Sequence, residues 1–189
     1  TQDDKTDVLI SRADQARRGG NPKAALETLL MLNPQRATSK ATHLQAIGQC
    51  HLMQGKVGEA LAAQKQIIAL FQTGEIPVDK QLYYLETVMA MKLRAGEADE
   101  ELDSCFNRYR RLLEDGSLAG PIKQRALAML HSLMGSAGIL QGRFGEAAGY
   151  FYECYMQAPA LRNKAVAALQ YLHAIWNAKP DDLSPRTLE

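Results

Sequence analysis

The sequence lacks any apolar run that approaches the roughly 20 residues a helix needs to cross a bilayer. Its first residues, TQDDKTD, are charged where a secretory signal would be apolar. A strong charge of one sign is missing too, because 22 Lys and Arg nearly balance 21 Asp and Glu and leave a net charge of +1. These absences predict a chain that does not insert into a membrane and has no overall field to attract nucleic acid.

Cysteine is also scarce. The chain has three, Cys50, Cys105 and Cys154, with no C-x-x-C spacing and no histidine at ligand distance. We interpret them as reduced thiols that fill small core positions, rather than as a metal or redox site. Reduced thiols fit a reducing compartment, so we predict a cytoplasmic protein. Because the chain begins at Thr1 without an initiator Met, we expect it to be processed or to be a piece of a longer protein.

Motifs that carry known catalytic chemistries are missing as well. The sequence contains no P-loop, no G-x-G-x-x-G after a strand, no G-x-S-x-G and no H-E-x-x-H. The four histidines are isolated from one another: His43, His51, His131 and His173. Without a convergent acid, base or nucleophile, we predict a protein that is not an enzyme and holds no cofactor or metal.

What the sequence does contain is apolar residues at helical spacing along nearly its whole length, interrupted at Gly, Pro or Asn. The alternation of β-branched residues that would indicate strands is almost absent. Pro22 and Pro121 stand where a proline is tolerated in the first turn of a helix. The pattern predicts an all-α chain with helices near residues 5–19, 22–32, 38–54, 57–73, 79–95, 97–114, 122–141, 144–157 and 161–178.

An internal repeat underlies this pattern. The segment IGQCHLMQGKVGEAL (47–61) returns in altered form 87 positions later as MGSAGILQGRFGEAA (134–148). Four glycines at the expected turns between paired helices are spaced by 35, 41 and 46 residues: Gly20, Gly55, Gly96 and Gly142. A left-handed residue is least costly there as glycine, and periods of this length indicate stacked helix pairs.

In this pattern the chain resembles the tetratricopeptide repeat (TPR) family. The family's 34-residue unit carries a large residue, Leu-Gly, an aromatic, a turn Gly, an Ala, a second aromatic and a closing Pro. The second unit of this chain matches at Leu44, Ile47, Gly48, Gly55, Ala60 and Leu61. The fourth unit matches at Met134, Gly135, Gly142, Phe144, Ala147, Phe151, Cys154 and Pro159. The first and third units fit more loosely, and the third has Glu101 where the small Ala belongs.

The resemblance implies a right-handed α-α superhelix, or solenoid, of about four helix-turn-helix repeats in one domain, residues 1–189. The repeats are expected at about 5–34, 38–73, 79–114 and 122–159, with a capping helix at 161–178. Gly48 and Gly135 lack a Cβ where the first helix of a pair must approach the second. Ala60 and Ala147 are the small residues expected to complete that approach.

We expect the capping helix to bury one apolar stripe against the array and to leave its other side wet. The stripe comprises Leu161, Ala165, Leu169, Leu172, Ile175 and Trp176. Trp176 is therefore expected to pack in the core or against the preceding Tyr and Phe cluster, YFYECY. Gln170 is expected to point away from the stripe.

In the TPR family, the first helices of successive pairs line a concave groove that holds a segment of another protein. Carried over in register, the inward positions begin with Asp7, Ile10, Asp14, Arg17 and Thr42. The residues that we select as the partner-binding groove are Gln45, Gln49, Leu52, Met53, Tyr83, Glu86, Arg94, Ser132, Ser136 and Leu140. Family members that bind chaperone C-termini place Lys and Asn on this face, and this chain has Gln, Glu, Ala and Ser instead. That particular activity is therefore not carried over.

The groove mixes amides, which can bond a peptide backbone, with Leu, Met and Ile. We predict a non-catalytic scaffold or adaptor whose partner is a protein or peptide. The alternative is a module that senses a small ligand or peptide within a larger transcription-factor or signalling protein. A closed apolar pocket would favour the alternative, and an open groove would favour the adaptor. A homodimer is a further expectation, because Leu52, Met53 and Leu140 are apolar residues that a second copy would cover.

Overall fold

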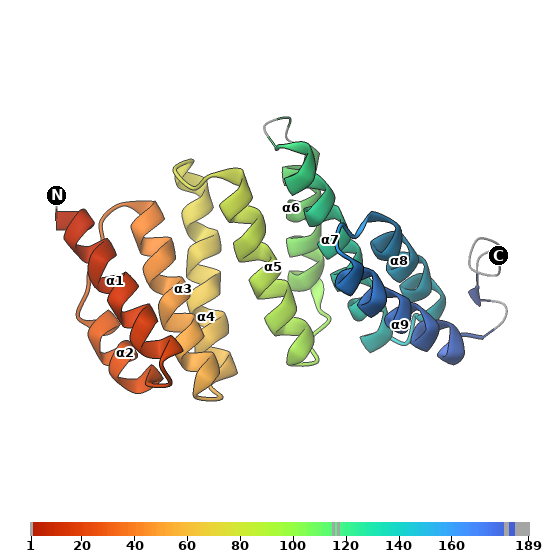
Figure 1. Cartoon of the computed structure of the whole chain (residues 1–189), viewed down its shortest axis with the longest axis horizontal. Helices are drawn as coiled ribbons and strands as arrows, with labels where there is room; N and C mark the ends of the chain where they lie inside the picture. Colours follow the sequence, from red (N-terminus) through yellow and green to blue (C-terminus); the bar gives the residue numbers. More distant parts are fainter. Residues whose placement is uncertain (1, 115, 117, 180–181, 184–189) are drawn as a thin grey trace. The chain divides into compact units, whose positions relative to one another are not determined.

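The computed structural model describes residues 2–114, 116, 118–179 and 182–183. These residues form nine α-helices and one short 3₁₀ helix, with no strand among them (Figure 1). The elements are α1 (Gln2–Arg18), α2 (Pro22–Leu30), α3 (Ala37–Met53), α4 (Val57–Ala69), η1 (Leu70–Thr73), α5 (Val78–Arg94), α6 (Glu100–Glu114), α7 (Gly120–Leu140), α8 (Phe144–Gln157) and α9 (Leu161–Asn177). The predicted all-α class is confirmed, and every predicted helix is present with its ends shifted by a few residues.

Two compact units make up the chain, Thr1–Met91 and Lys92–Glu189. The boundary falls inside α5, so the first unit holds α1 to α4, η1 and most of α5. The second unit holds the last residues of α5 and α6 to α9. That residues 1–189 form one domain stays a prediction.

The turns between paired helices are built as the glycine pattern predicts. Gly20, Gly55, Gly96 and Gly142 have φ angles of 90°, 74°, 76° and 71°. Only glycine adopts this left-handed region without a steric penalty. Each of these residues therefore ends the first helix of a pair and lets the chain reverse.

The start of α2 shows how the second helix of a pair begins. Asn21 is its N-cap, and its side-chain oxygen accepts the backbone N–H of Ala24 at 3.2 Å. Pro22 follows in the first turn, as predicted, where its missing N–H needs no partner. The helix is therefore specified locally by a glycine turn, a capping side chain and a proline.

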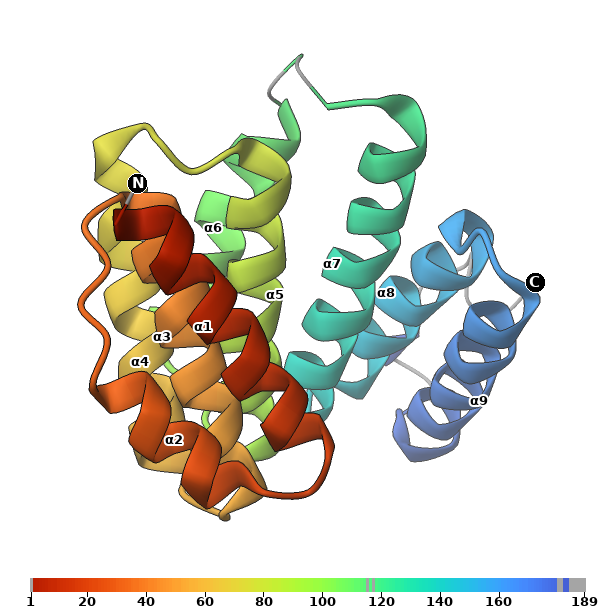
Figure 2. The ribbon, with the colours of Figure 1, turned by 60° about the vertical axis from the view of Figure 1, so that its left-hand side comes forward.

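Small and branched apolar residues on facing sides of α1, α2 and α3 form a core of the first unit. Its buried members are Ile10, Ala13, Ala25, Leu29, Ala46 and Cys50. Within each helix they recur every three or four residues, which places them on one face. Accordingly, α2 contacts both α1 and α3, and α3 pairs with α4 (Figure 2).

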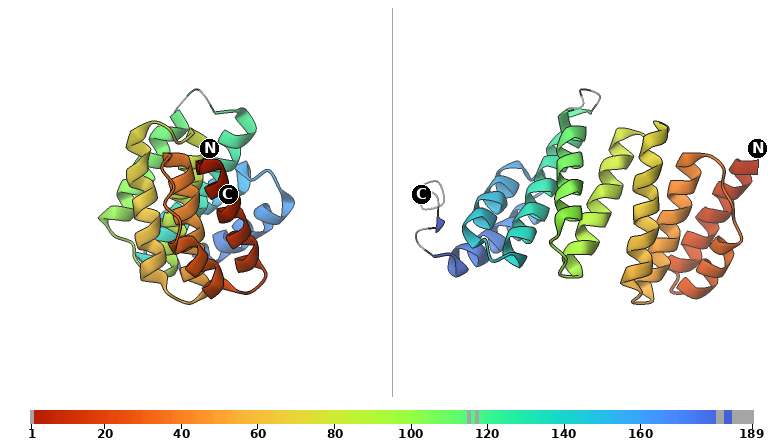
Figure 3. Two further views of the ribbon diagram at one scale, coloured as in Figure 1. Left: turned by 90° about the vertical axis from the view of Figure 1, so that its left-hand side faces the viewer. Right: turned by 180° about the vertical axis from the view of Figure 1, so that it is seen from behind.

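In the second unit α8 contacts both α7 and α9 (Figure 3). Phe151, which is only 2% exposed, lies in a cluster with Ala147, Ala148 and Ala174. On α6, the buried Tyr109 hydroxyl donates a hydrogen bond to the Ala126 carbonyl of α7 at 3.2 Å. Alanines at the contacts let the helices approach closely, while the aromatic ring fills the remaining space.

The repeated Gly48 and Gly135 do stand where first and second helices meet. A Cβ placed on Gly48 would lie 2.9 Å from Nε2 of Gln64 and 3.4 Å from the Ala60 carbonyl oxygen. A Cβ placed on Gly135 would lie 2.6 Å from Cε1 of Phe151. Gln64 and Phe151 are themselves 87 positions apart, so the same contact recurs in both units.

One part of the predicted approach is corrected in the fourth repeat. The residue that faces Gly135 is Phe151 rather than Ala147. Ala147 instead faces Gly138, whose Cβ would lie 3.1 Å from the Ala147 Cβ. The tight approach is therefore made by two glycines on successive turns of α7, each opposite a different residue of α8.

The predicted orientation of the last helix is wrong. The buried side of α9 holds Ala167 and Ala174, and Ile175 of the predicted stripe packs beside them. The other large members of the stripe, Leu161, Leu169, Leu172 and Trp176, are exposed. Trp176 is 88% exposed instead of lying in the core. The reason is steric, because the two alanines of α9 pack closely on Ala147, Ala148, Phe151 and Cys154 of α8, an approach that leucines or an indole would prevent.

The start of α6 also differs from the predicted start of 97–114. Asp99 caps the helix, because its Oδ1 accepts the backbone N–H of Leu102 at 3.0 Å. The helix proper begins at Glu100. Side-chain capping therefore overrides the apolar periodicity that extended the prediction backward.

Candidate functional site

The first unit contains a cavity of about 430 Å³ on the side where α1, α3 and α5 meet. Its lining residues come from these three helices alone: Asp7, Ile10, Ser11, Asp14, Arg17, Arg18, Thr42, Gln45, Ala46, Gln49 and Tyr83. We call this the polar cavity. Three of the predicted groove residues, Gln45, Gln49 and Tyr83, lie in it together.

The local reason for this convergence is helical periodicity. On α3, Thr42, Gln45 and Gln49 are three and four residues apart, so their side chains leave the helix on one side. On α1, Asp7, Ile10 and further residues at the same spacing do so too. Both helices are the first of their pair, and the second helices α2 and α4 contribute no lining residue.

An ion-pair group forms one wall of the polar cavity. Asp14 accepts hydrogen bonds from Nε of Arg17 at 2.7 Å and from Nε of Arg18 at 2.8 Å. The same Arg17 places Nη1 at 3.6 Å from the Met53 sulfur. The guanidinium groups keep further N–H donors with which they can bind a carbonyl or carboxylate oxygen.

The opposite wall is made of amides and a phenol. Nε2 of Gln45 donates to the hydroxyl of Tyr83 at 3.3 Å. The other amide atom of Gln45, Oε1, is buried and has no hydrogen-bond partner within the described protein. A buried acceptor without a donor is costly, so a ligand that offers an N–H there would be favoured.

A second cavity, of about 410 Å³, lies in the second unit. We call it the apolar cavity, because Leu, Ile and Phe make up most of its lining. Its residues are Leu93, Ser136, Ile139, Leu140, Phe151, Leu169, Gln170 and His173. Two predicted groove residues, Ser136 and Leu140, lie in it. The oxygen of the Gln170 amide is buried without a partner, as is that of Gln45 in the polar cavity.

The remaining predicted groove residues line neither cavity: Leu52, Met53, Glu86, Arg94 and Ser132. Met53 is half exposed beside the polar cavity and touches Arg17 through its sulfur. The Ser132 carbonyl accepts the hydroxyl of Ser136 at 2.9 Å within α7. The predicted set therefore divides between the two units, and each cavity holds only part of it.

Residues from α9 are the ones that the sequence analysis missed at the apolar cavity. Leu169, Gln170 and His173 line it, although Leu169 was predicted to lie in a buried stripe and Gln170 to point away from that stripe. The sequence signal that points to this arrangement is the pair of alanines Ala167 and Ala174, which are seven residues apart and mark the buried side. Small residues at heptad spacing indicate the close helix contact better than the leucines do.

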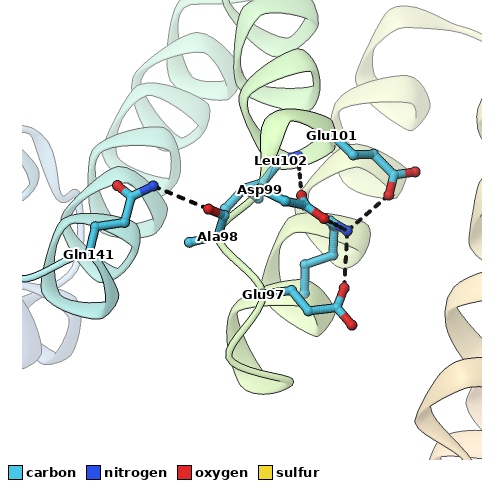
Figure 4. A network of polar contacts seen from close by, with 7 residues as sticks. Glu97, Ala98, Asp99, Glu101, Leu102 and Gln141 are labelled. Atoms are coloured by element: carbon cyan, nitrogen blue, oxygen red, sulfur yellow. Dashed lines mark hydrogen bonds and ion pairs between the residues drawn. The ribbon is translucent and has the colours of Figure 1, made fainter.

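A buried lysine is the most constrained polar group in the second unit. The side chain of Lys92 is 1% exposed, and its ammonium donates to Glu97, Asp99 and Glu101 at 3.1, 2.9 and 2.9 Å (Figure 4). Burial by itself would lower the pKa of Lys92, but hydrogen bonds to the three carboxylates outweigh it and raise the pKa above 10.5. The group therefore stays charged and ties the turn before α6 to α5.

The same network lowers the pKa of one acid. The Lys92 ammonium, helped by the Leu102 backbone N–H, holds the pKa of Asp99 below its ordinary 3.8. Next to it, the side-chain amide of Gln141 on α7 donates to the Ala98 carbonyl at 3.3 Å (Figure 4). These contacts explain the geometry of the turn before α6.

Burial shifts the pKa values of the three cysteines and of His131. All three thiols are buried, as predicted. Burial raises the pKa of Cys105 to about 11 and that of Cys50 and Cys154 above 9.0, which keeps them protonated near neutral pH. The ring of His131 stacks on Tyr150 at a centroid distance of 6.2 Å, and burial lowers its pKa below 6.5.

Within the described part of the chain, no three His, Cys, Asp or Glu side chains gather as a metal site. None of the described helices combines the length and apolar character required to cross a membrane. Comparison of the chain with protein-family models, curated proteins and solved structures finds no match. The candidate site therefore rests on the two cavities and their chemistry.

Proposed function

We propose that this chain is a non-catalytic interaction module of the TPR type, which binds a segment of another protein in the polar cavity. The single observation that carries the proposal is the convergence of α1, α3 and α5 on one cavity. In a right-handed solenoid of helix pairs, the first helices line the inner surface and the second helices lie outside. The lining of the polar cavity follows that division, since α2 and α4 are not part of it.

The chemistry of the polar cavity suits an extended peptide. A peptide backbone offers both N–H donors and carbonyl acceptors, and Oε1 of Gln45 is a buried acceptor that lacks a donor. The Arg17 and Arg18 side chains supply donors for carbonyl or carboxylate oxygens. Ile10 and Ala46 add an apolar floor, on which a small aliphatic side chain can pack.

Affinity capture from cytoplasmic extract, followed by calorimetry with the captured partner, tests the proposal. Gln49→Arg places a long cation inside the polar cavity, and we expect it to weaken binding at least tenfold. The matched control is Gln66→Arg, the same change at an exposed position of α4, which lines neither cavity. A partner that binds both variants and the wild type equally would place the site elsewhere.

A specific observation supports the alternative of a ligand-sensing module. The apolar cavity, at about 410 Å³, falls within the size range of small-molecule pockets, roughly 300–1,000 Å³. Its polar groups, Ser136, Gln170 and His173, would fix the orientation of an apolar ligand that carries one hydrogen-bonding group.

A thermal-shift screen of apolar small molecules addresses this alternative. A ligand of the apolar cavity is expected to raise the melting temperature of the wild type and to have no effect on Leu140→Glu. Because Leu140 is exposed, this substitution leaves the fold intact. A ligand that stabilises both proteins equally would contradict binding in the apolar cavity.

A further inference from the structure

The outer side of α9 exposes large apolar side chains that no described residue of its unit buries. Leu161, Leu169, Leu172 and Trp176 are 84%, 68%, 60% and 88% exposed. Single exposed leucines are common on protein surfaces, but a contiguous row is not. We call these residues, with the exposed Ala165 between them, the α9 stripe.

The α9 stripe is narrow and straight. At about 100° per residue, positions 161, 165, 169, 172 and 176 fall within an arc of about 80° on the helix. An apolar stripe this narrow is typical of a helix that contacts one other helix. A helix that packs on a broad surface has a wider apolar stripe. The opposite side of α9 is already occupied by the contact of Ala167 and Ala174 with α8.

The α9 stripe is also symmetrical about its middle, the point between Ala168 and Leu169. Leu161 and Trp176 lie equally far from this point, and so do Ala165 and Leu172. When two such helices run antiparallel about a twofold axis, four of the five positions of the stripe meet a counterpart in the stripe, and Leu169 meets the half-buried Ala168. Leu172 then packs on the small Ala165 of the second copy, and Trp176 covers its Leu161. This is the self-complementarity that an isologous interface requires.

Charge on α9 does not oppose this pairing and offers little to another kind of partner. The sequence has no carboxylate between Glu153 and Asp181, so a basic partner finds no counter-charge there. The Lys164 ammonium lies 5.5 Å from the centre of the Tyr155 ring, on the side toward α8. Arg162 follows Leu161 at the end of the α9 stripe where the antiparallel register brings the indole of the second copy, a favourable cation–π neighbour.

The size of the surface fits a moderate dimer. The four large side chains form a patch at the upper end of the roughly 300–600 Å² found for the largest patch on a monomer. Two such patches covering one another reach the lower end of stable interfaces, about 1,200 Å² in total. The expected affinity is therefore in the micromolar range, where dissociation is measurable.

From these observations we propose that the α9 stripe is a homodimer interface in which two copies of α9 pair antiparallel about a twofold axis. Of the residues on which the sequence placed a dimer contact, Leu140 lines the apolar cavity together with Leu169 of the α9 stripe, and Leu52 and Met53 line neither cavity. The proposed interface therefore borders the apolar cavity. It is also independent of the proposed function, because none of the α9 stripe lies in the polar cavity.

Sedimentation equilibrium of the full chain over a concentration series is the first test. We expect a monomer–dimer equilibrium for the wild type and at least a hundredfold weaker association for Leu172→Glu. The matched control is Met31→Glu, at an exposed apolar position outside α9, which should dimerise like the wild type. Far-UV circular dichroism checks that Leu172→Glu keeps its helix content.

Cross-linking tests the register. Chains carrying Ala165→Cys and chains carrying Leu172→Cys should form a disulfide-linked dimer when mixed and oxidised, and each alone should not. The native thiols do not interfere, because all three are buried. Equal cross-linking of Ala165→Cys with itself would overturn the antiparallel arrangement.

Two further outcomes would overturn the proposal as a whole. One is a wild-type chain that remains monomeric up to about 100 µM. The other is a dimer that survives Leu172→Glu. If the monomeric chain instead binds anionic phospholipid vesicles through the α9 stripe, and Leu172→Glu abolishes that binding, the stripe is a lipid-facing surface and not a dimer contact. Gln49→Arg should leave dimerisation unchanged, which separates failure of this proposal from failure of the peptide-binding proposal.

Discussion

Replacing Gly135 with alanine is the sharpest test of how α7 meets α8. The new Cβ would lie 2.6, 2.8 and 2.9 Å from Cε1, Cζ and Cδ1 of Phe151. Side-chain carbons rarely approach within 3.4 Å, so the ring has to move. Phe151 is 2% exposed and packs against the alanines of its cluster, so a shift of the ring away from Gly135 disturbs those contacts, although one side of the ring borders the apolar cavity.

Two opposing effects decide the magnitude. Alanine is a better helix former than glycine by about 1 kcal/mol, which favours the substituted protein. Overpacking a close-packed core costs about 1–3 kcal/mol, and contact with three ring atoms places this site at the upper end. We therefore expect Gly135→Ala to destabilise the second unit by about 1–2 kcal/mol. At Gly149 of α8, where a Cβ meets nothing within 4 Å, the same change should stabilise by about 0.5–1 kcal/mol.

Urea unfolding followed by far-UV circular dichroism measures both variants. Because the chain has two compact units, the curves are fitted with two transitions, and hydrogen exchange at α7 and α8 amides assigns the affected one. If Gly135→Ala proves as stable as Gly149→Ala, the close contact with Phe151 does not exist. Phe151→Leu replaces the ring with a smaller side chain and so relieves the clash with a Cβ at position 135. It should therefore lower the free energy of unfolding less in the Gly135→Ala protein than in the wild type.

Two further changes follow from the described contacts. Lys92→Met should destabilise the second unit by about 1–3 kcal/mol, less than a fully buried pair would, because the three carboxylates keep water access. Since the pKa of Lys92 is raised and that of Asp99 is lowered, the difference in free energy of unfolding between the wild type and Lys92→Met should be largest between about pH 5 and pH 10. It should fall as acid protonates Asp99 and again as base deprotonates Lys92; a gap that does not vary from pH 3 to pH 7 in urea titrations would argue against the ion pairs. Ala60→Leu, at a fully buried contact between α3 and α4, should lower the stability of the first unit by about 1–3 kcal/mol, and an unchanged thermal midpoint would contradict the packing.

The helices and the pairing turns were predictable because their signals are local. Gly20 and Gly142 adopt the left-handed conformation that a helix-ending glycine predicts. The recurrence of Gly48 at Gly135 correctly indicated where paired helices approach. Periodicity puts Gln45 and Gln49 on one side of α3, and the register of the TPR resemblance selected that side, so part of the candidate site followed from the sequence.

Errors arose where a face of a helix had to be assigned to a neighbour. Hydrophobicity predicts burial of the leucines of α9 and of Trp176, but in the structure Ala167 and Ala174 are the α9 residues buried against α8. Periodicity predicts that a helix such as α9 has an apolar side, but it does not predict which side packs against the neighbouring helix α8. That choice depends on the volumes of the residues opposite, which are distant in sequence.

The network of Lys92 shows the same division between local and tertiary information. The three acids that bind Lys92 follow it within nine residues, and Asp99 is a recognisable helix cap. From the sequence alone, however, such charged residues are predicted to lie on the solvated surface. Their convergence requires the turn after Gly96 to fold back over the end of α5.

The sequence by itself determined nine helices, their glycine turns and the repeat of one close approach, because each depends on backbone preferences within a few residues. Only the tertiary structure decided which side of α9 is buried, which residues share a cavity and how Lys92 is neutralised. These depend on packing volume and on electrostatic contacts between helices, which no local pattern contains.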